Sequence, residues 1–432
     1  MRLSLSSALF LGCATLLAPA AGAQQSTCNA PASDPIVQLD MPGNPFEPVV
    51  TPDGCWIFVT LTGGNEQGGG RVVVVRRDAG SLRVERIAEL NGNPTGAVLT
   101  HDGRLLIVAD GGYVAFLDAQ KLIRGDGNPV LGYMGNGAAV GFINVNVTRD
   151  DRLLFAAAER AEAIEVINLD TARATGFADR AVIGRIPTGN APISVTLSPD
   201  EKYLYTTSEG ARVEWGWPRD CKPDEQPSRT PPPARPEPRQ NNNRHGGIAP
   251  RPTPDAVRTA PPAAYHARGT IMVVDVPTAA TNPQSSVRSI VAAGCEPVRL
   301  VLSPDGATAY VSARSDDQLL AFDTQRLLSD TAHALIGHVD VGVAPVGVAV
   351  VDSGARLFVT NSNRFEGGAD DRQPVAIVDA TKLRAGGSKA KIGTIPAGAF
   401  PRELRVSADG RTLFVTNFAS RTLEMVDLAR AH

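Results

Sequence analysis

The chain has 432 residues, of which 20% are charged, and its formal net charge at pH 7 is −3. This balance lacks the basic excess that is typical of proteins that bind nucleic acids or anionic membranes. Five cysteines and six histidines occur without the spacings of zinc or haem sites, so the sequence predicts no metal site and no evident cofactor.

The first 23 residues have the pattern of a signal peptide. A positively charged start is followed by an apolar run over residues 3–17 and by small residues at 21–23. The apolar run is too short to cross a bilayer. We expect cleavage before Gln24, which leaves an exported protein, periplasmic or extracellular, over residues 24–432. Lipidation at Cys13 is an alternative, but the residues before Cys13 match a lipidation box poorly.

A phrase recurs along the rest of the chain: a proline, seven residues, an Asp-Gly pair or a variant of it, and a β-rich run that ends in Val-Thr-Asn or similar. The turns follow one another roughly every 50 residues, which is the length of a four-stranded propeller blade, and one interval is about twice as long. The sequence therefore predicts seven blades. Their turns begin at Asp53, Asp102, Asp150, Asp200, Asp305, Ser353 and Asp409.

Turn chemistry supports this division. We expect each Asp-Gly pair to supply the positive φ angles of a tight hairpin between the first and second strands of a blade. We also expect an acid or amide at the end of the third strand to cap the next turn. These capping residues are Asp118, Asn168, Asp275, Asp323, Asp379 and Asp427.

The two ends of the chain predict how the ring closes. Few residues follow Asp427, so the last blade has no fourth strand of its own. Residues 35–41 alternate apolar and polar side chains directly before the first blade, and pairing them with 423–427 would remove an open sheet edge. We therefore predict an all-β, single-domain, seven-bladed propeller whose N-terminal strand completes the last blade.

The long interval carries an insertion in blade 4, between its second and third strands. Residues 211–268 are rich in proline and arginine and poor in aliphatic side chains, so we expect a disordered segment. The alternative is a flexible lid or partner-binding arm, anchored by Cys221, Trp215 and Trp217. Smaller insertions at 63–70 and 363–371 occupy the same position in blades 1 and 6. All three fall on the face that carries the loops between second and third strands, here called the top face.

Four cysteines remain after removal of the signal peptide, and propeller geometry selects their pairing. Cys28 and Cys55 fall on the bottom rim of adjacent blades, whereas Cys221 and Cys295 fall in loops of the top face. We predict the disulfides Cys28–Cys55 and Cys221–Cys295, as expected in an oxidising compartment.

The first strand of each blade faces the central channel of a propeller, so the residue two after the repeat proline is expected near its upper mouth. This places Glu403 close to Glu47, with Arg402 and Glu296 nearby. The residues at this position are Glu47, Gly96, Ser194, Arg299, Gly347 and Glu403, and Asn144 is their expected counterpart in the irregular blade 3, which lacks the proline. The ends of the second strands add Glu159, Glu209, Arg314, Asn361 and Asn417.

These side chains allow two interpretations. In the first, Glu47 and Glu403 are catalytic bases or metal ligands and Arg299 holds an anionic substrate. In the second, the charges solvate the channel or pair with one another, and no nucleophile elbow, phosphate loop or dinucleotide motif speaks for catalysis. The remaining candidates for ligand binding are Asn144, Ser194, Glu209, Arg314, Asn361 and Asn417.

Residues 302–312, 356–361 and 410–417 resemble the YVTN family of bacterial β-propeller repeats. The resemblance covers about 35–428 apart from the insertion. It implies a seven-bladed propeller, often exported, in a superfamily that includes lactonase-like enzymes, haem-d1-type domains and members with no assigned activity. The chain lacks an evident cluster of His, Glu and Arg side chains such as the resemblance to a phosphogluconolactonase-like site would imply.

We therefore expect an exported, non-catalytic propeller that acts as a binding or scaffold module through its top face. Its partner would be a protein or a cell-envelope component, and we expect neither nucleic-acid binding nor a transmembrane segment. The alternative is a lactonase-like hydrolase or a metal-assisted enzyme with its site at the channel mouth. A third hypothesis, an accessory to a periplasmic redox enzyme, finds no cofactor ligands in the sequence.

Overall fold

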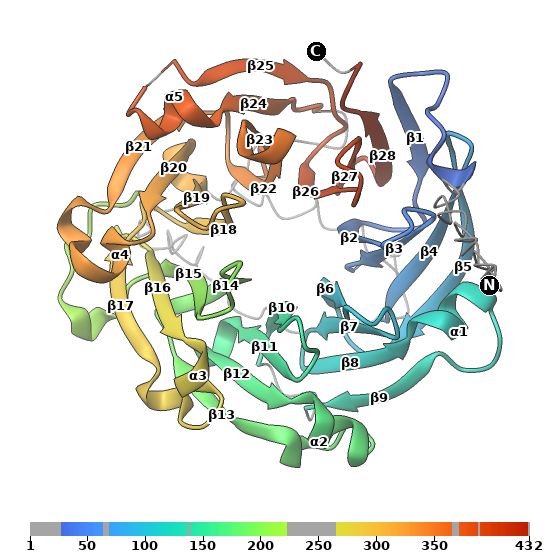
Figure 1. Cartoon of the computed structure of the whole chain (residues 1–432), viewed down its shortest axis with the longest axis horizontal. Coiled ribbons are helices and arrows are strands. Elements are labelled where there is room, and N and C mark those ends of the chain that lie inside the picture. The colour runs from blue at the N-terminus through green and yellow to red at the C-terminus, as the bar shows by residue number, and fades with distance from the viewer. Residues whose placement is uncertain are drawn as a thin grey trace, which may run out of the picture.

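The computed structural model describes residues 27–63, 69–135, 137, 140–222, 265–364, 371–387 and 389–430. These residues form seven four-stranded antiparallel sheets arranged around a central axis (Figure 1), which confirms the predicted propeller. The strands are β2 (Pro45–Val50), β3 (Trp56–Leu61), β4 (Gly70–Asp78) and β5 (Ser81–Leu90) in blade 1; β6 (Pro94–Leu99), β7 (Leu105–Asp110), β8 (Tyr113–Asp118) and β9 (Val130–Met134) in blade 2; β10 (Phe142–Val147), β11 (Leu153–Ala158), β12 (Ala163–Asn168) and β13 (Val182–Pro187) in blade 3; β14 (Asn190–Leu197), β15 (Tyr203–Gly210), β16 (Thr270–Asp275) and β17 (Val287–Ala292) in blade 4; β18 (Pro297–Leu302), β19 (Thr308–Ala313), β20 (Gln318–Asp323) and β21 (Leu335–Asp340) in blade 5; β22 (Pro345–Val351), β23 (Arg356–Asn361), β24 (Val375–Asp379) and β25 (Lys391–Ile395) in blade 6; and β26 (Pro401–Val406), β27 (Thr412–Asn417), β28 (Thr422–Asp427) and β1 (Ile36–Asp40) in blade 7.

Blade 7 is completed by the N-terminal strand, as predicted. β1 runs antiparallel to β28, from Ile36 opposite Val426 to Asp40 opposite Thr422, and the two strands lie side by side in Figure 1. This pairing covers the outer edge of β28, which would otherwise expose unpaired N–H and C=O groups.

The hairpin between the first and second strands of blade 1 differs from the prediction. Gly54 is left-handed, with φ of 71°, and its N–H donates to the carbonyl of Thr51 (2.8 Å), but Asp53 has no positive φ. Instead the Asp53 carboxylate accepts from the Thr51 hydroxyl (2.5 Å) and from the Cys55 N–H (3.1 Å). The turn is therefore a four-residue turn in which the acid supplies hydrogen bonds and only the glycine supplies the left-handed angle.

Short helices follow the third strands, where the sequence predicted capped turns. Asp118 accepts from the N–H of Lys121 (2.9 Å), and Asn168 accepts from that of Thr171 (2.8 Å), so the predicted caps are confirmed. The runs are too short to show helical periodicity in the sequence, which is why only their caps were predicted. The helices are α1 (Ala119–Arg124), α2 (Leu169–Ala174), α3 (Val276–Ala279), α4 (Arg326–Ser329) and α5 (Ala380–Arg384).

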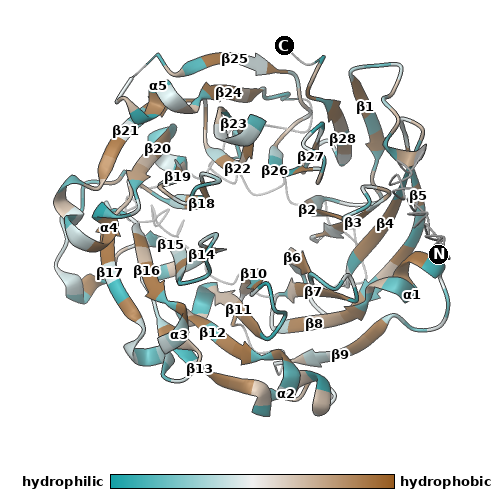
Figure 2. Ribbon diagram, viewed as in Figure 1, coloured by the Kyte–Doolittle hydropathy of each residue, from teal (hydrophilic) through white to brown (hydrophobic). Residues whose placement is uncertain are grey.

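The core lies between neighbouring blades rather than at one centre. Figure 2 shows hydrophobic residues along the strands of each sheet. Between blades 2 and 3, for example, Phe116 stacks on Phe177 with ring centroids 4.4 Å apart, and Phe116 is fully buried. Burying such a side chain stabilises the fold by about 1.5–3 kcal/mol, so each blade depends on its neighbours.

A β-bulge near the start of each first strand interrupts the pairing of the first and second strands close to the axis of the ring. In blade 7 the register of β26 against β27 shifts between Pro401 and Leu404, which takes Glu403 out of the ladder. The Glu403 N–H donates instead to Oγ1 of Thr416 (3.1 Å). That hydroxyl in turn donates to the carbonyl of Phe46 in blade 1 (2.8 Å). One threonine thus satisfies the bulge and joins two blades.

The same hydroxyl bridge recurs around the axis, from the threonine or serine of the Val-Thr-Asn-like phrase to the next blade. The repeated hydroxyl therefore has a structural role at the innermost contact between blades. The bridges run from Thr60 to the carbonyl of Thr95 (2.5 Å), from Thr207 to Val298 (2.7 Å), from Ser312 to Val346 (2.7 Å) and from Thr360 to Arg402 (2.9 Å).

Both predicted disulfides are present. Cys28 and Cys55 are bonded with Cα atoms 5.4 Å apart, and Cys221 and Cys295 with Cα atoms 5.6 Å apart. Disulfides of this kind persist in oxidising compartments. None of the helices in the described ranges is long and apolar enough to cross a bilayer.

Candidate functional site at the channel mouth

Three residues that the sequence singled out meet near the axis, although they come from blades 1, 5 and 7. Arg299 on β18 places Nη2 2.5 Å from Oε1 of Glu403 on β26. Blade 6 has Gly347 at the corresponding position, where a Cβ atom would lie 2.5 Å from the carbonyl oxygen of Arg402. Glu47 on β2 lies close enough to Glu403 for the negative charge of Glu403 to raise the pKa of Glu47.

These groups are buried and paired, not exposed to a wet channel. Glu47, Arg299 and Glu403 are 5%, 7% and 4% exposed. Glu47 accepts a hydrogen bond from Nη2 of Arg405 through its Oε1 atom. Burial raises the pKa of Glu47, Arg405 opposes this effect, and the charge of Glu403 adds to it. Both carboxylates therefore have a guanidinium partner, and neither is presented to a substrate as an accessible base.

Other residues of the same layer join one blade to the next. The Asn144 side-chain oxygen accepts from the N–H of Val195 (3.2 Å), and the Ser194 hydroxyl accepts from that of Leu300 (3.4 Å). A Cβ atom on Gly96 would lie 2.7 Å from the carbonyl oxygen of Ile143, so this position must stay small. The layer is consequently packed against backbone.

Two further asparagines that were predicted as ligand candidates, Asn361 and Asn417, are buried. Nδ2 of Asn361 donates to the carbonyl of Pro374 (3.0 Å), and Nδ2 of Asn417 donates to the hydroxyl of Thr422 (3.0 Å). Both side chains fix the loops at the upper ends of their blades.

A second charged cluster lies at the top of blades 4 and 5. Arg314, which is 4% exposed, donates from Nε (2.9 Å) and Nη2 (2.6 Å) to Oε2 of Glu296. Its Nη1 donates to Oε1 of Glu209 (2.9 Å). Burial raises the pKa of Glu159 nearby, and the charge of Glu209 raises it further. Glu209 and Arg314 are thus brought together as an ion-paired group.

The stems of the blade 4 insertion begin beside this cluster. The backbones of Cys221 and His266 exchange two hydrogen bonds (3.1 and 3.0 Å), and Cys221 is bonded to Cys295, the neighbour of Glu296. Nε2 of His266 lies 4.0 Å from Oε1 of Glu296. The greater part of the predicted insertion, residues 223–264, lies outside the described residues.

Arg402 is a functional candidate that the sequence analysis named only as a neighbour. Its Cζ atom lies 3.7 Å from the ring centroid of Phe46, 5.5 Å from that of Phe400 and 5.7 Å from that of Phe418. In the described ranges its guanidinium has no hydrogen bond or ion pair. Burial lowers its pKa to about 9 while Glu403 opposes this effect, so the group is protonated at neutral pH. A guanidinium stacked on aromatic faces keeps its N–H edges available for an anion.

A sequence signal for Arg402 did exist. The residue directly after the repeat proline is apolar in most blades, as in Ile193, Val298 and Val346, which pack together near the axis. Arg402 replaces this apolar side chain in blade 7, and an aromatic residue precedes its proline. Of the three rings that surround Arg402, however, Phe46 comes from the other end of the chain.

Two polar cavities open on the top face, one beside the first strands of blades 2 and 3 and the other beside the outer strand β1 of blade 7. The first has a volume of about 500 Å³, lies between blades 2 and 3, and includes Asn93, Tyr113 and Glu159 in its lining. Asp110 lies beneath it, because its carboxylate accepts from the N–H of Gly92 (2.9 Å), a lining residue. Burial raises the pKa of Asp110 to about 6.

The second cavity has a volume of about 520 Å³ and lies between blades 6 and 7, where Arg372, Asp40 and Thr422 line it. Glu424 follows Thr422 on the same face of β28, and burial raises its pKa to about 7. Among the described residues, no three His, Cys, Asp or Glu side chains are placed to hold a metal ion.

This geometry defines the chain as a seven-bladed β-propeller whose top face combines ion-paired clusters with polar cavities. Solved structures share the fold. A chain of Kuenenia stuttgartiensis hydrazine synthase is 16% identical, with a TM-score of 0.59 over 91% of this chain and 97% of that chain. A chain of the mitotic checkpoint complex is 14% identical, with a TM-score of 0.59 over 99% of each chain. The periplasmic gluconolactonase of Pseudomonas aeruginosa is 21% identical, with a TM-score of 0.55 over 83% of this chain and 86% of that chain.

At these identities the likeness establishes the fold alone. No protein-family model matches the chain, and no curated protein matches its sequence. Assignment of a function therefore depends on the side chains of this protein.

Proposed function

We propose that this protein is an exported β-propeller that binds an anionic group of a partner at the mouth of its top face, with Arg402 as the principal contact. The observation that carries this proposal is the contrast between Arg402 and the neighbouring arginines. Arg299, Arg314 and Arg405 each pair with a carboxylate. Arg402 has no such partner in the described ranges, and three phenylalanine rings hold it in place.

The pairing of the carboxylates supports binding rather than hydrolysis. A general base must come within hydrogen-bond reach of the proton that it removes. Glu47 and Glu403 are almost fully buried and each contacts a guanidinium, so their charges hold blades 1, 5 and 7 together.

The size and position of the top-face loops favour a large partner, such as a protein or a cell-envelope component. The stems of the insertion are fixed beside the Arg314 cluster by the disulfide Cys221–Cys295. Export is supported by the N-terminal signal pattern and by the two disulfides.

The experiment is a thermal-shift screen of the mature protein with three defined anionic probes: oligogalacturonate, a polyglutamate peptide and polyphosphate. We expect at least one probe to raise the melting temperature of the wild type. The Arg402→Gln variant should lose this shift, whereas Arg104→Gln on the bottom face should retain it. Equal shifts in wild type and Arg402→Gln, or no shift with any probe, would contradict the assignment. Turnover of a sugar lactone that is abolished by Glu403→Gln would favour a hydrolase instead.

A further inference from the structure

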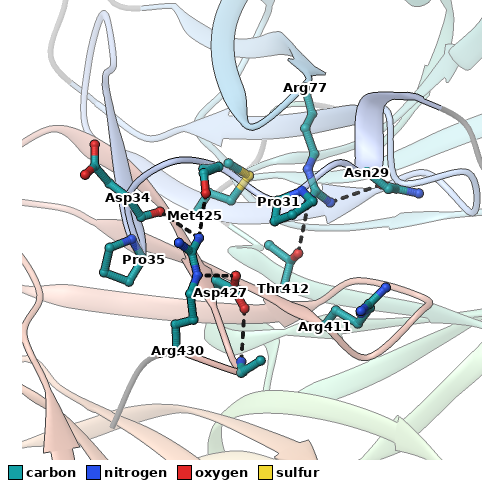
Figure 3. A pocket seen from close by; sticks show the side chains of 12 residues that line it. Asn29, Pro31, Asp34, Pro35, Arg77, Arg411, Thr412, Met425, Asp427 and Arg430 are labelled. Carbon is teal, nitrogen blue, oxygen red and sulfur yellow. Dashed lines mark hydrogen bonds and ion pairs between the residues drawn. The ribbon is translucent and has the colours of Figure 1, made fainter.

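A cavity of about 350 Å³ lies on the bottom face, at the seam where the N-terminal segment meets blade 7 (Figure 3). This cavity is separate from the top-face site, because none of the residues discussed above for ligand binding lines it. Its lining combines arginines with apolar side chains: Asn29, Pro31, Ala32, Asp34, Pro35, Arg77, Arg411, Thr412, Met425, Asp427, Ala429 and Arg430.

Arg77, at the end of β4, supplies a buried positive charge to this cavity. It is 3% exposed. Its Nη1 donates to the side-chain oxygen of Asn29 and its Nη2 to the hydroxyl of Thr412, both at 3.1 Å (Figure 3). Its Nε has no hydrogen-bond partner, and within the described part of the chain no carboxylate lies within ion-pair distance.

A buried guanidinium with only neutral partners is costly unless an anion compensates its charge. Burial lowers the pKa of Arg77, and the more distant carboxylates of Asp409 and Asp427 only partly offset this effect. By comparison, the equally buried Arg299 and Arg314 both contact carboxylates directly. Arg77 therefore has unused N–H donors and an uncompensated charge.

The acidic side chains that line the cavity do not form ion pairs with Arg77. Asp427 accepts from Nε of Arg430 (2.7 Å), and Arg430 also donates to the carbonyls of Ala32 (2.7 Å) and Ser33 (3.0 Å). Asp34 is exposed, and in Figure 3 its carboxylate points away from Arg77. Arg430 thus forms one wall of the cavity and neutralises the charge of Asp427. The positive charge of Arg77 therefore has no direct countercharge in the cavity lining.

We infer that this cavity binds a small organic carboxylate with an apolar body, with the carboxylate on Arg77 and the body against Pro31, Pro35 and Met425. The planar fork of a guanidinium matches the two oxygens of a carboxylate. The proline rings and the buried Met425 side chain supply an apolar surface of fixed shape. A cavity of this volume accommodates a compact ligand.

The test is isothermal titration calorimetry on the mature full-length protein with hexanoate and benzoate as probes. Hexanamide has the apolar chain of hexanoate without its negative charge, so it tests the need for the charge. Sulfate is an anion without an apolar part, so it tests the need for the apolar body. Arg77→Met removes the charge. Ala429→Leu fills the rim of the cavity without altering Arg77, and it provides a second variant should Arg77→Met fail to fold. Arg104→Gln serves as a matched surface control.

We expect the carboxylates to bind to the wild type and to Arg104→Gln. They should bind at least about tenfold more weakly to Arg77→Met, which loses a charge-assisted hydrogen bond, and at least about tenfold more weakly to Ala429→Leu, in which the leucine side chain occupies the space of the ligand. Hexanamide and sulfate should bind at least about tenfold more weakly than hexanoate. Absence of carboxylate binding to the wild type would overturn the inference. So would equal binding of hexanamide, stronger binding of sulfate, or unchanged affinity in both cavity variants. Arg402→Gln should leave this binding intact, so the outcome is independent of the top-face proposal.

Discussion

Arg299 of blade 5 and Glu403 of blade 7 form an ion pair of 2.5 Å, and both side chains are more than nine-tenths buried. The pair connects two blades that are not neighbours. It therefore constrains the ring in a way that contacts between adjacent sheets do not.

Removal of one partner should destabilise the protein strongly. Arg299→Met leaves Glu403 buried without its main countercharge, and we expect the free energy of unfolding to fall by about 3–5 kcal/mol. Urea denaturation followed by circular dichroism measures this change. The double variant Arg299→Met, Glu403→Leu should recover most of the loss. Arg71→Gln, which breaks the exposed pair with Glu89, should cost less than about 1 kcal/mol. A similar small loss for Arg299→Met would show that the buried pair does not constrain the ring.

The hydroxyl bridge of Thr416 gives a second stability prediction. Thr416→Val keeps the shape of the side chain but leaves the Glu403 N–H and the Phe46 carbonyl without this partner. We expect a loss of about 1–3 kcal/mol in the free energy of unfolding, because unsatisfied buried polar groups keep their desolvation cost. Thr416→Ser retains the hydroxyl and should lose less. Equal losses in the two variants would indicate that packing of the methyl group, not the bridge, is responsible.

Glu424 predicts how stability depends on pH. Burial raises its pKa from the ordinary 4.5 to about 7, so the folded protein binds this proton more tightly than the unfolded chain does. The contribution of Glu424 to stability is fully present below pH 4.5 and is lost as the pH rises to about 7, by an amount on the order of 3 kcal/mol.

Glu424→Gln should remove this dependence. Melting temperatures of the wild type and the variant, measured from pH 4 to 8, should differ progressively, with the variant gaining relative to the wild type as the pH rises. Glu89→Gln, which changes an exposed side chain, controls for net charge. Parallel pH profiles would mean that Glu424 titrates normally.

The disulfide Cys221–Cys295 should stabilise the top face. It joins residues 74 positions apart, and chain entropy assigns a closed loop of this length about 4 kcal/mol. We expect the double variant Cys221→Ser, Cys295→Ser to melt at a lower temperature. Limited proteolysis should also cut it faster near Cys221, because the pairing with His266 loses its anchor. Unchanged proteolysis would show that the stems are held by other contacts.

Features encoded locally could be predicted from the sequence. The repeat turns predicted the number of blades, and the alternation over residues 35–41 predicted the closing strand. The polar residues at the ends of the third strands predicted the helix caps. The cysteines could be paired because the predicted propeller already placed their loops on opposite faces. Each of these inferences needs only neighbouring residues or the position of a residue within a repeat.

The chemistry of the site could not be predicted in the same way. The burial of Glu47 and Glu403 depends on partners from other blades, Arg405 of blade 7 for Glu47 and Arg299 of blade 5 for Glu403. The cage of three phenylalanine rings around Arg402 depends on Phe46, which is distant in sequence. The cavity beside Arg77 depends on segments from both ends of the chain. Such arrangements follow from ring closure and have no local pattern.

The most direct test of the account is the affinity of the wild type and of Arg402→Gln for the anionic probe that stabilises the protein best, measured by calorimetry at neutral pH. We expect Arg402→Gln to weaken binding by about tenfold or more. A melting temperature close to that of the wild type would show that the cage has not collapsed. Equal affinity of the two proteins for that probe would contradict the assignment of Arg402 as the contact that defines the function.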